Sequence, residues 1–232
     1  MSVWRDFWNK SHRIYVNDRH KAVHYRQVAD DILSVLPQGT REVVLDYGCG
    51  EALEAGRVAA RAERLLLFDT ARDVRERLAR RLAGDERVSI LNEAALAAMP
   101  DGTVDLMIVN SVVQYLDRAE FDTLLARAKR LLRPGGLLVI ADVIPPDAGM
   151  VADVFSLLRT ALRHGFLGAA AAGLAATFFS DYRRLRRSVG LATYTEEAMH
   201  GILGSAGFAA ERRQRNFGFN PQRMTFLARR PG

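Results

Sequence analysis

The chain contains very little cysteine and no long uncharged run. Cys49 is the only cysteine among 232 residues, so an internal disulfide is excluded, and no cysteine and histidine set has the spacing of a structural zinc site. Arg5, Asp6 and Lys10 interrupt the apolar residues at the N-terminus, which argues against a signal peptide. The longest uncharged stretch, 164–180, is shorter than the roughly 20 residues that a membrane-spanning helix needs. We therefore expect a cytoplasmic protein that is neither secreted nor transmembrane.

Lysine is also scarce, because 30 of the 33 basic residues are arginine, and the net charge is +6. Residues 147–232 hold 12 basic and 6 acidic residues, whereas residues 1–146 hold 21 of each, so the net charge lies in the last third of the chain. A basic face of this kind suits nucleic acid, anionic lipid or an anionic substrate. The alternative is an arginine-rich composition that serves no such partner.

Hydrophobic residues make up 49% of the chain and charged residues 26%, which is typical of one globular domain. From Arg41 onward, short apolar runs alternate with helical segments, and this alternation predicts an α/β fold with a parallel sheet covered on both faces. The predicted strands are Val43–Leu45, Leu65–Phe68, Val88–Leu91, Leu106–Val109 and Leu137–Ala141, and the predicted helices lie near 51–62, 71–83 and 117–132.

The sequence pattern divides this single domain into four parts. They are an N-terminal cap (1–40), a core (41–146), a helical insertion (147–194) and a C-terminal part (195–232). The cap contains an amphipathic helix over about 19–36, which Pro37 ends. The C-terminal part begins with a short helix and continues with two strands near 209–217 and 223–229, which we expect to form an antiparallel edge.

The first predicted strand runs into a glycine-rich turn, Asp46-Tyr-Gly48-Cys-Gly50-Glu51. The glycines let the backbone pass close to a ligand, and the start of the next helix offers unpaired N–H groups to an anionic group such as a carboxylate. The carboxylate of Asp46 would repel a pyrophosphate but could accept hydrogen bonds from an ammonium. We therefore expect an amino-acid-like ligand, and we expect a branched side chain at Gly48 to enter the space of that ligand.

Further polar residues follow the second, third and fourth strands. Asp69 lies 23 positions after Asp46, where a doubly wound fold meets the ribose of an adenosine; the alternative is a simple N-cap of the next helix. The side-chain amide of Asn92 follows the third strand, where it could reach the amine of an adenine. The other polar residues at these strand ends are Glu93, Asn110, Ser111 and Gln114.

In these motifs the sequence resembles the class I S-adenosylmethionine-dependent methyltransferases. The turn at 46–50 resembles the family's glycine-rich first motif, Asp69 its ribose-binding acid, and Asn92 its adenine-side residue, although Asp is commoner there. Pro134-Gly-Gly136 resembles the turn before the fifth strand, whereas Ala52 stands where many members carry glycine. The resemblance implies a Rossmann-like, doubly wound, mostly parallel seven-stranded sheet with an antiparallel edge hairpin, to which the cap and the insertion are added.

The resemblance also implies that S-adenosyl-L-methionine lies across the carboxyl ends of the strands. The residues implied to bind it are Asp46, Gly48, Cys49, Gly50, Asp69, Thr70, Asn92, Glu93, Asn110, Ser111 and Gln114. Asp142, at the end of the fifth strand, would be a metal ligand in a catechol-type methyltransferase, but no neighbouring acidic pair follows it. We therefore expect no metal.

The insertion indicates what receives the methyl group. An apolar helical face is followed by a cationic step, which suits an amphiphile with an anionic head or an anionic membrane surface. The apolar residues are Val151, Val154, Phe155, Leu158, Ala161 and Leu162, and the arginines are Arg183, Arg184, Arg186 and Arg187. Three interpretations stay open: a lid over a small apolar or amphiphilic substrate, a peripheral contact with an anionic membrane, and a packed lid with solvated arginines.

Three residues of the cap, His20, His24 and Tyr25, are the candidates for a base that removes the acceptor's proton, because a neutral imidazole titrates near working pH. Tyr194 and His200 come next. Solvated histidines are the alternative, and a carbon or neutral-amine acceptor needs no base.

Rival functions fit less of the sequence. A nicotinamide-dependent reductase explains neither Asp46 nor the Pro-Gly-Gly turn. A nucleic-acid methyltransferase would use the basic last third, but the fourth strand ends in Asn110-Ser-Val-Val and lacks the Asn/Asp-Pro-Pro-aromatic turn that stacks a flipped base, which argues against nucleic acid as a partner. A non-catalytic cofactor-binding protein of the same fold is the remaining alternative.

Overall fold

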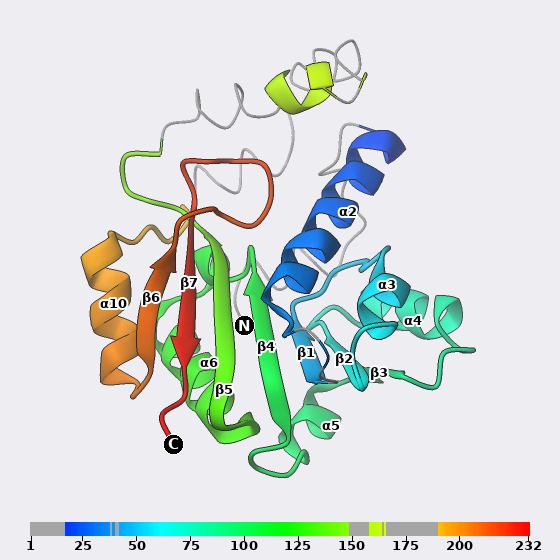
Figure 1. Cartoon of the computed structure of the whole chain (residues 1–232), viewed down its shortest axis with the longest axis horizontal. Coiled ribbons are helices and arrows are strands. Elements are labelled where there is room, and N and C mark those ends of the chain that lie inside the picture. The colour runs from blue at the N-terminus through cyan, green and yellow to red at the C-terminus, as the bar shows by residue number, and fades with distance from the viewer. Residues whose placement is uncertain (1–16, 38, 40–41, 149–157, 164, 166–189) are drawn as a thin grey trace.

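A computed structural model describes residues 17–37, 39, 42–148, 158–163, 165 and 190–232. These residues form a seven-stranded sheet in the order β3-β2-β1-β4-β5-β7-β6 (Figure 1). The strands are β1 (Val43–Tyr47), β2 (Arg64–Phe68), β3 (Val88–Leu91), β4 (Val104–Asn110), β5 (Leu132–Val143), β6 (Ala209–Arg213) and β7 (Met224–Arg229). The first five strands pair in parallel, and β7 is antiparallel to both β5 and β6. The predicted fold class and the antiparallel edge are thus confirmed.

The helices lie close to the predicted segments. They are α2 (Asp18–Val35), α3 (Ala55–Ala59), α4 (Arg72–Arg81), α5 (Glu93–Ala97), α6 (Arg118–Leu131), α10 (Glu196–Ser205) and the 3-10 turn η1 (Val113–Tyr115). The predicted helix at 51–62 is shorter, because the chain passes through the turn and the left-handed residue Ala52 before α3 begins. The short α5 was not predicted. Asn92 starts α5 by accepting a hydrogen bond from Ala95 N at 2.8 Å.

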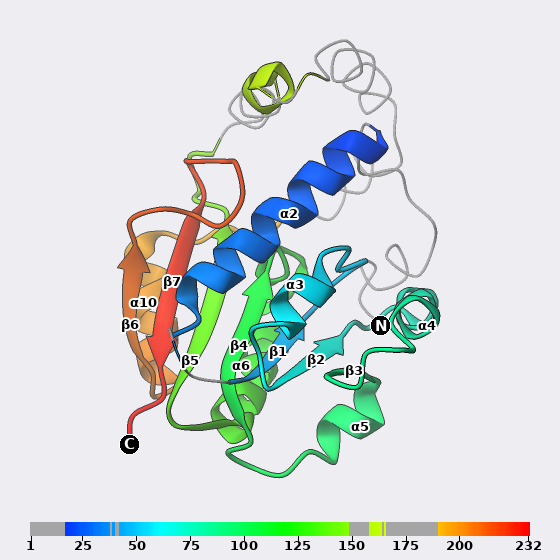
Figure 2. The same ribbon diagram turned by 45° about the vertical axis from the view of Figure 1, so that its right-hand side comes forward.

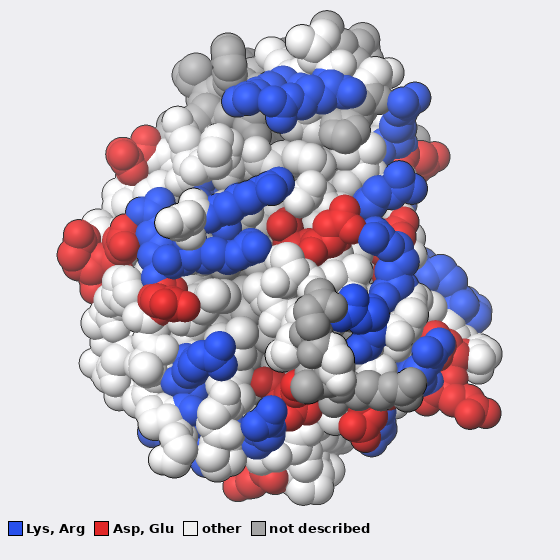
Figure 3. Space-filling view, in the orientation of Figure 1, with Lys and Arg blue, Asp and Glu red and all other residues white. Residues whose placement is uncertain are grey.

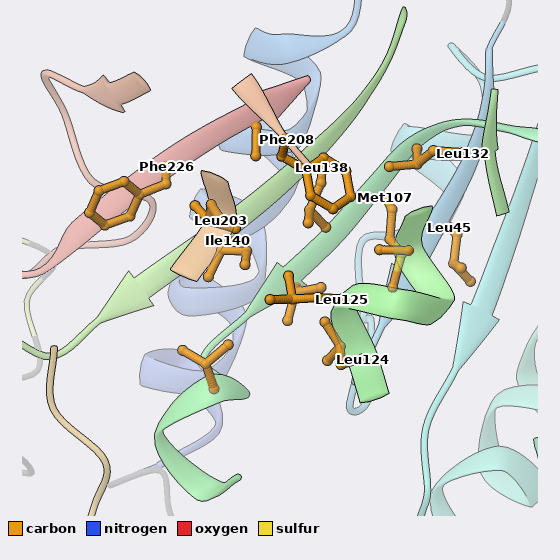
Figure 4. Packing of buried hydrophobic residues seen from close by; sticks show 14 of the residues in the cluster. Leu45, Met107, Leu124, Leu125, Leu132, Leu138, Ile140, Leu203, Phe208 and Phe226 are labelled. Atoms are coloured by element: carbon orange, nitrogen blue, oxygen red, sulfur yellow. The ribbon is translucent and has the colours of Figure 1, made fainter. Parts of the chain in front are cut away.

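Side chains alternate between the two faces of the central strands, so each face has its own core. On one face, Leu65, Leu67 and Ile108 pack against helices α2, α3 and α4. On the other face, Leu66 and Met107 pack against α5, α6 and α10. Figure 4 shows ten labelled members of this second core, which are Leu45, Met107, Leu124, Leu125, Leu132, Leu138, Ile140, Leu203, Phe208 and Phe226. Each such side chain contributes about 1.5–3 kcal/mol to the free energy of folding when it is fully buried. Strands that are apolar on both faces therefore stabilise a sheet that is covered on both sides.

The sheet order reverses between β1 and β4, since the chain builds β1, β2 and β3 in one direction and then returns to place β4 on the other side of β1. In open parallel sheets, ligands bind at the carboxyl ends of the strands beside such a switch point. Helix α2 crosses one face of the sheet, and its N-terminal half extends past these carboxyl ends (Figures 1 and 2). The fold thus places α2 over the edge where the sequence predicts the cofactor.

Much of the insertion, including Val151, Val154, Phe155 and the four arginines at 183–187, lies outside the described residues. Within the part that is described, residues 158–163 are helical. Ala161 is fully buried but Leu162 is 70% exposed, so the described residues of the predicted apolar face do not all pack against the protein. Among the described helices, none has the length and apolar character to cross a bilayer.

Candidate functional site

The glycine-rich turn leaves β1 and bends sharply over the end of β2. Gly48 and Gly50 have φ values of 79° and 57°, a region that favours glycine. The backbone N–H groups of Gly48 and Cys49 both donate to the carbonyl of Phe68, at 2.7 and 3.1 Å. A Cβ atom on Gly48 would lie 2.5 Å from Cγ2 of Val112. The nearest protein neighbour of a side chain at Gly48 is therefore Val112.

Asp69 braces this turn from the neighbouring strand. Its Oδ2 accepts a hydrogen bond from Gly50 N at 3.0 Å, and its Oδ1 accepts one from Ala71 N at 2.8 Å. The N-cap position of α4 is Ala71, so Asp69 is not the simple N-cap of that helix. Its carboxylate joins the glycine-rich turn to the start of α4, which puts it at the carboxyl ends of β1 and β2 together.

Burial raises the pKa of both acidic residues at these strand ends. Burial, followed by the charge of Asp69, raises the pKa of Asp46 to about 7. Burial also raises the pKa of Asp69, although its two backbone N–H donors and nearby arginines oppose the rise. The pKa of the Cys49 thiol is raised as well, first by burial and then by both carboxylates. Neighbouring carboxylates of this kind favour a cationic ligand and disfavour an anionic one.

Helix α2 is fixed to the turn by two contacts. The backbone N–H of Glu51 donates to the hydroxyl oxygen of Tyr25 at 2.9 Å, and Lys21 Nζ pairs with the Glu51 carboxylate at 3.0 Å. His24 packs edge-on against Tyr25, with ring centroids 5.3 Å apart. Burial lowers the pKa of His20, and burial together with the charge of His20 lowers the pKa of His24 to about 4. The structure thus brings His20, His24 and Tyr25 onto one helix beside the turn, but the prediction that the imidazole titrates near working pH is wrong for His24.

The predicted adenine-side residues have other partners in this structure. Asn92 Oδ1 caps α5, and the exposed carboxylate of Glu93 pairs with Arg127 of α6. Thr70 is exposed, and its carbonyl accepts a hydrogen bond from Arg75 at 2.9 Å. Thr70 follows Asp69 at the end of β2, and Asn92 and Glu93 follow β3, which lies one strand further from the switch point.

A second polar cluster lies at the ends of β4 and β5. Ser111 Oγ donates to Asp142 Oδ2 at 2.7 Å, and Arg223 Nη1 lies 3.8 Å from the same oxygen. Gln114 is buried in η1, and its Oε1 has no hydrogen-bond partner among the described residues. Asn110 ends β4 beside them. The sequence indicates only one role for Asp142, that of a metal ligand, and no metal is expected there. Among the described residues, no group of three or more histidine, cysteine, aspartate or glutamate side chains could hold a metal ion.

The two other candidates for a base, Tyr194 and His200, pack against the second core. The ring of Tyr194 lies 5.7 Å from that of Phe121, and the ring of His200 lies 5.4 Å from that of Phe226. Burial raises the pKa of Tyr194. Neither arrangement is that of a base facing the glycine-rich turn.

The sheet order, the antiparallel β7 and the glycine-rich turn define the class I methyltransferase fold. The solved structure of the Burkholderia thailandensis 1,6-didemethyltoxoflavin-N1-methyltransferase shares it with a TM-score of 0.61 and 19% identity, and the match covers 99% of this chain and 88% of that one. A Haemonchus contortus phosphoethanolamine N-methyltransferase shares it with a TM-score of 0.63 and 18% identity, and the match covers 99% of this chain and 48% of that one. At these identities the likeness concerns the fold alone.

Sequence comparison gives the family. Residues 45–140 match the methyltransferase domain family. The chain is 28% identical over 125 residues to an uncharacterized methyltransferase of Mycobacterium bovis, which covers 54% of this chain and 60% of that protein. It is 27% identical over 172 residues to a demethylmenaquinone methyltransferase of Clavibacter sepedonicus, and this alignment covers 73% of this chain and 66% of that protein. Residues 45–140 therefore form a methyltransferase domain, which has the class I fold, and the chain spans about three fifths of the length of its Mycobacterium relative.

Proposed function

We propose that the chain transfers a methyl group from S-adenosylmethionine to a small apolar or amphiphilic molecule. The observation that carries this proposal is the pair Asp46 and Asp69 at the carboxyl ends of β1 and β2, on either side of a turn that two left-handed glycines allow. S-adenosylmethionine carries an ammonium and a sulfonium, and when bound it supplies an activated methyl group on that sulfonium. A cation-favouring edge suits this ligand better than it suits the pyrophosphate of a nicotinamide cofactor.

The residues present fit such a cofactor. Asp46 would accept hydrogen bonds from the ammonium, and Asp69 from the ribose hydroxyls, since a carboxylate accepts more than the two N–H groups that Asp69 already receives. Asn92 and Glu93 would border the adenine. The remaining proposed contacts are Gly48, Cys49, Gly50, Thr70 and Asn110, whereas Ser111 and Gln114, which the resemblance assigns to the cofactor, are proposed below to face the methyl acceptor instead. The chain's contribution to catalysis is to align the reactants and exclude water, with α2 covering the edge.

The acceptor is proposed to be a small molecule. The Clavibacter relative is named for demethylmenaquinone, and it matches nearly three quarters of this chain, which supports an apolar acceptor. The cap residues His20, His24 and Tyr25 are the proposed proton acceptors. His20 is the strongest of them, because the pKa of His24 of about 4 makes it a weak base and Tyr25 already receives the Glu51 N–H.

A peripheral contact with an anionic membrane is a further part of the proposal. The exposed Leu162 is flanked by the exposed Arg159 and Arg163 on the helical residues 158–163, an apolar side chain between two cationic ones. The face of the molecule that Figure 3 shows carries basic side chains in several groups, with acidic side chains between them. Sedimentation with anionic vesicles at low and high salt tests this part: we expect salt-sensitive binding that weakens when Leu162, Arg159 and Arg163 are replaced by serine. Binding that is absent, or unchanged in that variant, would leave the helix without a membrane role.

Methyl transfer itself is tested with purified protein and radiolabelled S-adenosylmethionine on fractionated cell extracts. We expect label to enter an organic-soluble small molecule, and we expect none in extracts incubated without the protein. Label that enters only nucleic acid would contradict the proposed substrate class, and no transfer to any fraction would favour a non-catalytic binding protein.

A further inference from the structure

Ser111, Gln114 and Asp142 lie at the carboxyl ends of β4 and β5, across the switch point from Asp46 and Asp69. We propose that these three residues form the binding site of the methyl acceptor, and that the acceptor presents an O–H or N–H group beside an apolar body. This inference rests on the proposed function and narrows its substrate class. The anchoring group need not be the one that is methylated.

Two of the three residues hold a backbone conformation that disfavours any side chain. Ser111 has a φ of 57° and Asp142 a φ of 62°. They follow the paired residues Asn110 and Ala141 of β4 and β5, and Ser111 N donates to the carbonyl of Ala141 at 3.1 Å. The two strained residues are therefore adjacent, and their side chains are joined at 2.7 Å. Strain of this kind persists where the surrounding structure enforces it, commonly at functional sites.

The Asp142 carboxylate is oriented from two sides. Ser111 and Arg223 approach the same oxygen, Oδ2, from β4 and from the loop before β7. A structural tether to that loop exists without this carboxylate, since Asp142 N lies 3.3 Å from Asn216 Oδ1, which also accepts a hydrogen bond from Thr225 at 2.8 Å. Anchoring the loop therefore does not require an acid at position 142.

Gln114 supplies the independent evidence for a ligand. Gln114 is only 5% exposed, and its side-chain Oε1 is buried with no hydrogen-bond partner among the described residues. An amide oxygen in that position costs free energy unless a donor reaches it. A ligand O–H or N–H is such a donor, whereas a ligand that offers only acceptors would leave the oxygen unsatisfied.

Gln114 and Asp142 belong to the same part of the site. The 3-10 turn η1 packs against β5. The Gln114 carbonyl accepts a hydrogen bond from Ala192 N, and the Ile144 carbonyl accepts one from Tyr194 N, both at 2.9 Å. Residues 192–194 thus connect η1 with the residues just after Asp142. Val113 and Val143 beside them belong to the second core, which fixes η1 and the end of β5 in place. The apolar body of the acceptor follows from the proposed function.

A matched pair of probes tests the site: 2-naphthol, and 2-methoxynaphthalene, which has the same rings without the hydroxyl hydrogen. Both are titrated by fluorescence into the full chain saturated with S-adenosylhomocysteine. We expect 2-naphthol to bind about tenfold more tightly, which is the discrimination that one charge-assisted hydrogen bond provides. We expect Asp142→Asn to remove most of this discrimination. Asp122→Asn, which changes an exposed carboxylate paired with Arg118 on α6, should keep it.

The variant Ser111→Gly distinguishes a role of Ser111 in ligand binding from a role in stability. Glycine relieves the left-handed backbone and removes the hydroxyl, so we expect the melting temperature to hold or rise while 2-naphthol binding weakens. A lowered melting temperature with unchanged 2-naphthol binding would show a structural cluster and overturn the proposal. Equal binding of the two probes, no binding of 2-naphthol, or full discrimination in Asp142→Asn would overturn it too. Binding of S-adenosylhomocysteine is measured first, so failure of this inference is distinguished from failure of the proposed function.

Discussion

The hydroxyl oxygen of Tyr25 in α2 accepts a hydrogen bond at 2.9 Å from the backbone N–H of Glu51, which ends the glycine-rich turn. The same hydroxyl lies 2.9 Å from where a Cβ atom on Gly50 would stand. The cap helix therefore defines one wall of the turn. This contact assigns Tyr25 a positioning role that is separate from any role as a base.

Tyr25→Phe should lower the free energy of unfolding by about 1 kcal/mol, because the Glu51 N–H loses its acceptor. Urea unfolding of the ligand-free chain measures this change. Tyr194→Phe is the matched control: it removes a hydroxyl from another half-buried tyrosine, and the ring contact with Phe121 remains, so little change is expected. Equal effects of the two variants would mean that the Tyr25 contact contributes no specific stability.

Gly48→Ala should be more destabilising than Gly135→Ala. Both glycines have a φ near 80°, but a Cβ atom on Gly48 meets Val112 at 2.5 Å, while one on Gly135 has nothing within 4 Å. The left-handed backbone costs about 1–2 kcal/mol at either site, and the collision should add about 1–3 kcal/mol at Gly48. Urea unfolding should show that Val112→Ala offsets part of the Gly48→Ala loss. If the double variant shows no such rescue, Val112 is not the source of the cost.

Asp46 should make the ligand-free chain less stable as pH rises. Its pKa is about 7 when folded and near 3.9 when unfolded, so its favourable contribution is complete below about pH 4 and is lost as pH rises through 7. Urea unfolding between pH 4 and pH 8 should show this loss, and Asp46→Asn should flatten it. Saturating S-adenosylmethionine should also reduce the loss, because its ammonium favours the ionised carboxyl. An unchanged profile in Asp46→Asn would assign the pH dependence to other groups.

His20→Ala should lower kcat more than His24→Ala does. A general base contributes typically 10²–10⁴-fold, and a group with a pKa of about 4 is a weak base at neutral pH. We expect a loss of about 10²-fold or more for His20→Ala and less than about 10-fold for His24→Ala, with cofactor affinity little changed in both. Steady-state rates with the acceptor found in extracts provide the measurement. Full turnover in His20→Ala would reject the cap as the source of the base.

The sequence predicts the central sheet well because its strands are buried on both faces and are apolar at nearly every position, as in Leu65–Phe68. It misses the first part of β5, since Pro134-Gly-Gly136 has the composition of a turn. In the structure these residues lie within β5 at a shift of its register against β4, and Gly135 N and Gly136 O exchange hydrogen bonds with the backbone of Arg230. It also misses α5, whose five residues are too few to show a helical period.

The site is only partly readable from the sequence. Asp46 and Asp69 stand out because each directly follows an apolar run. The Ser111–Asp142 pair does not, since it depends on the register of β4 against β5 and on two left-handed residues that composition does not mark. The contact between Tyr25 and Glu51 joins residues 26 positions apart, and only the packing of α2 on α3 creates it.

Isothermal titration of S-adenosylmethionine into the wild-type chain, Asp69→Ala and the exposed control Asp122→Ala tests cofactor binding directly. We expect one bound cofactor per chain, affinity about 10- to 150-fold weaker in Asp69→Ala, as for the loss of about 1.5–3 kcal/mol of charge-assisted hydrogen bonding, and unchanged affinity in Asp122→Ala. No binding to the wild-type chain, or equal affinity in Asp69→Ala, would show that the pair Asp46 and Asp69 does not form a cofactor site.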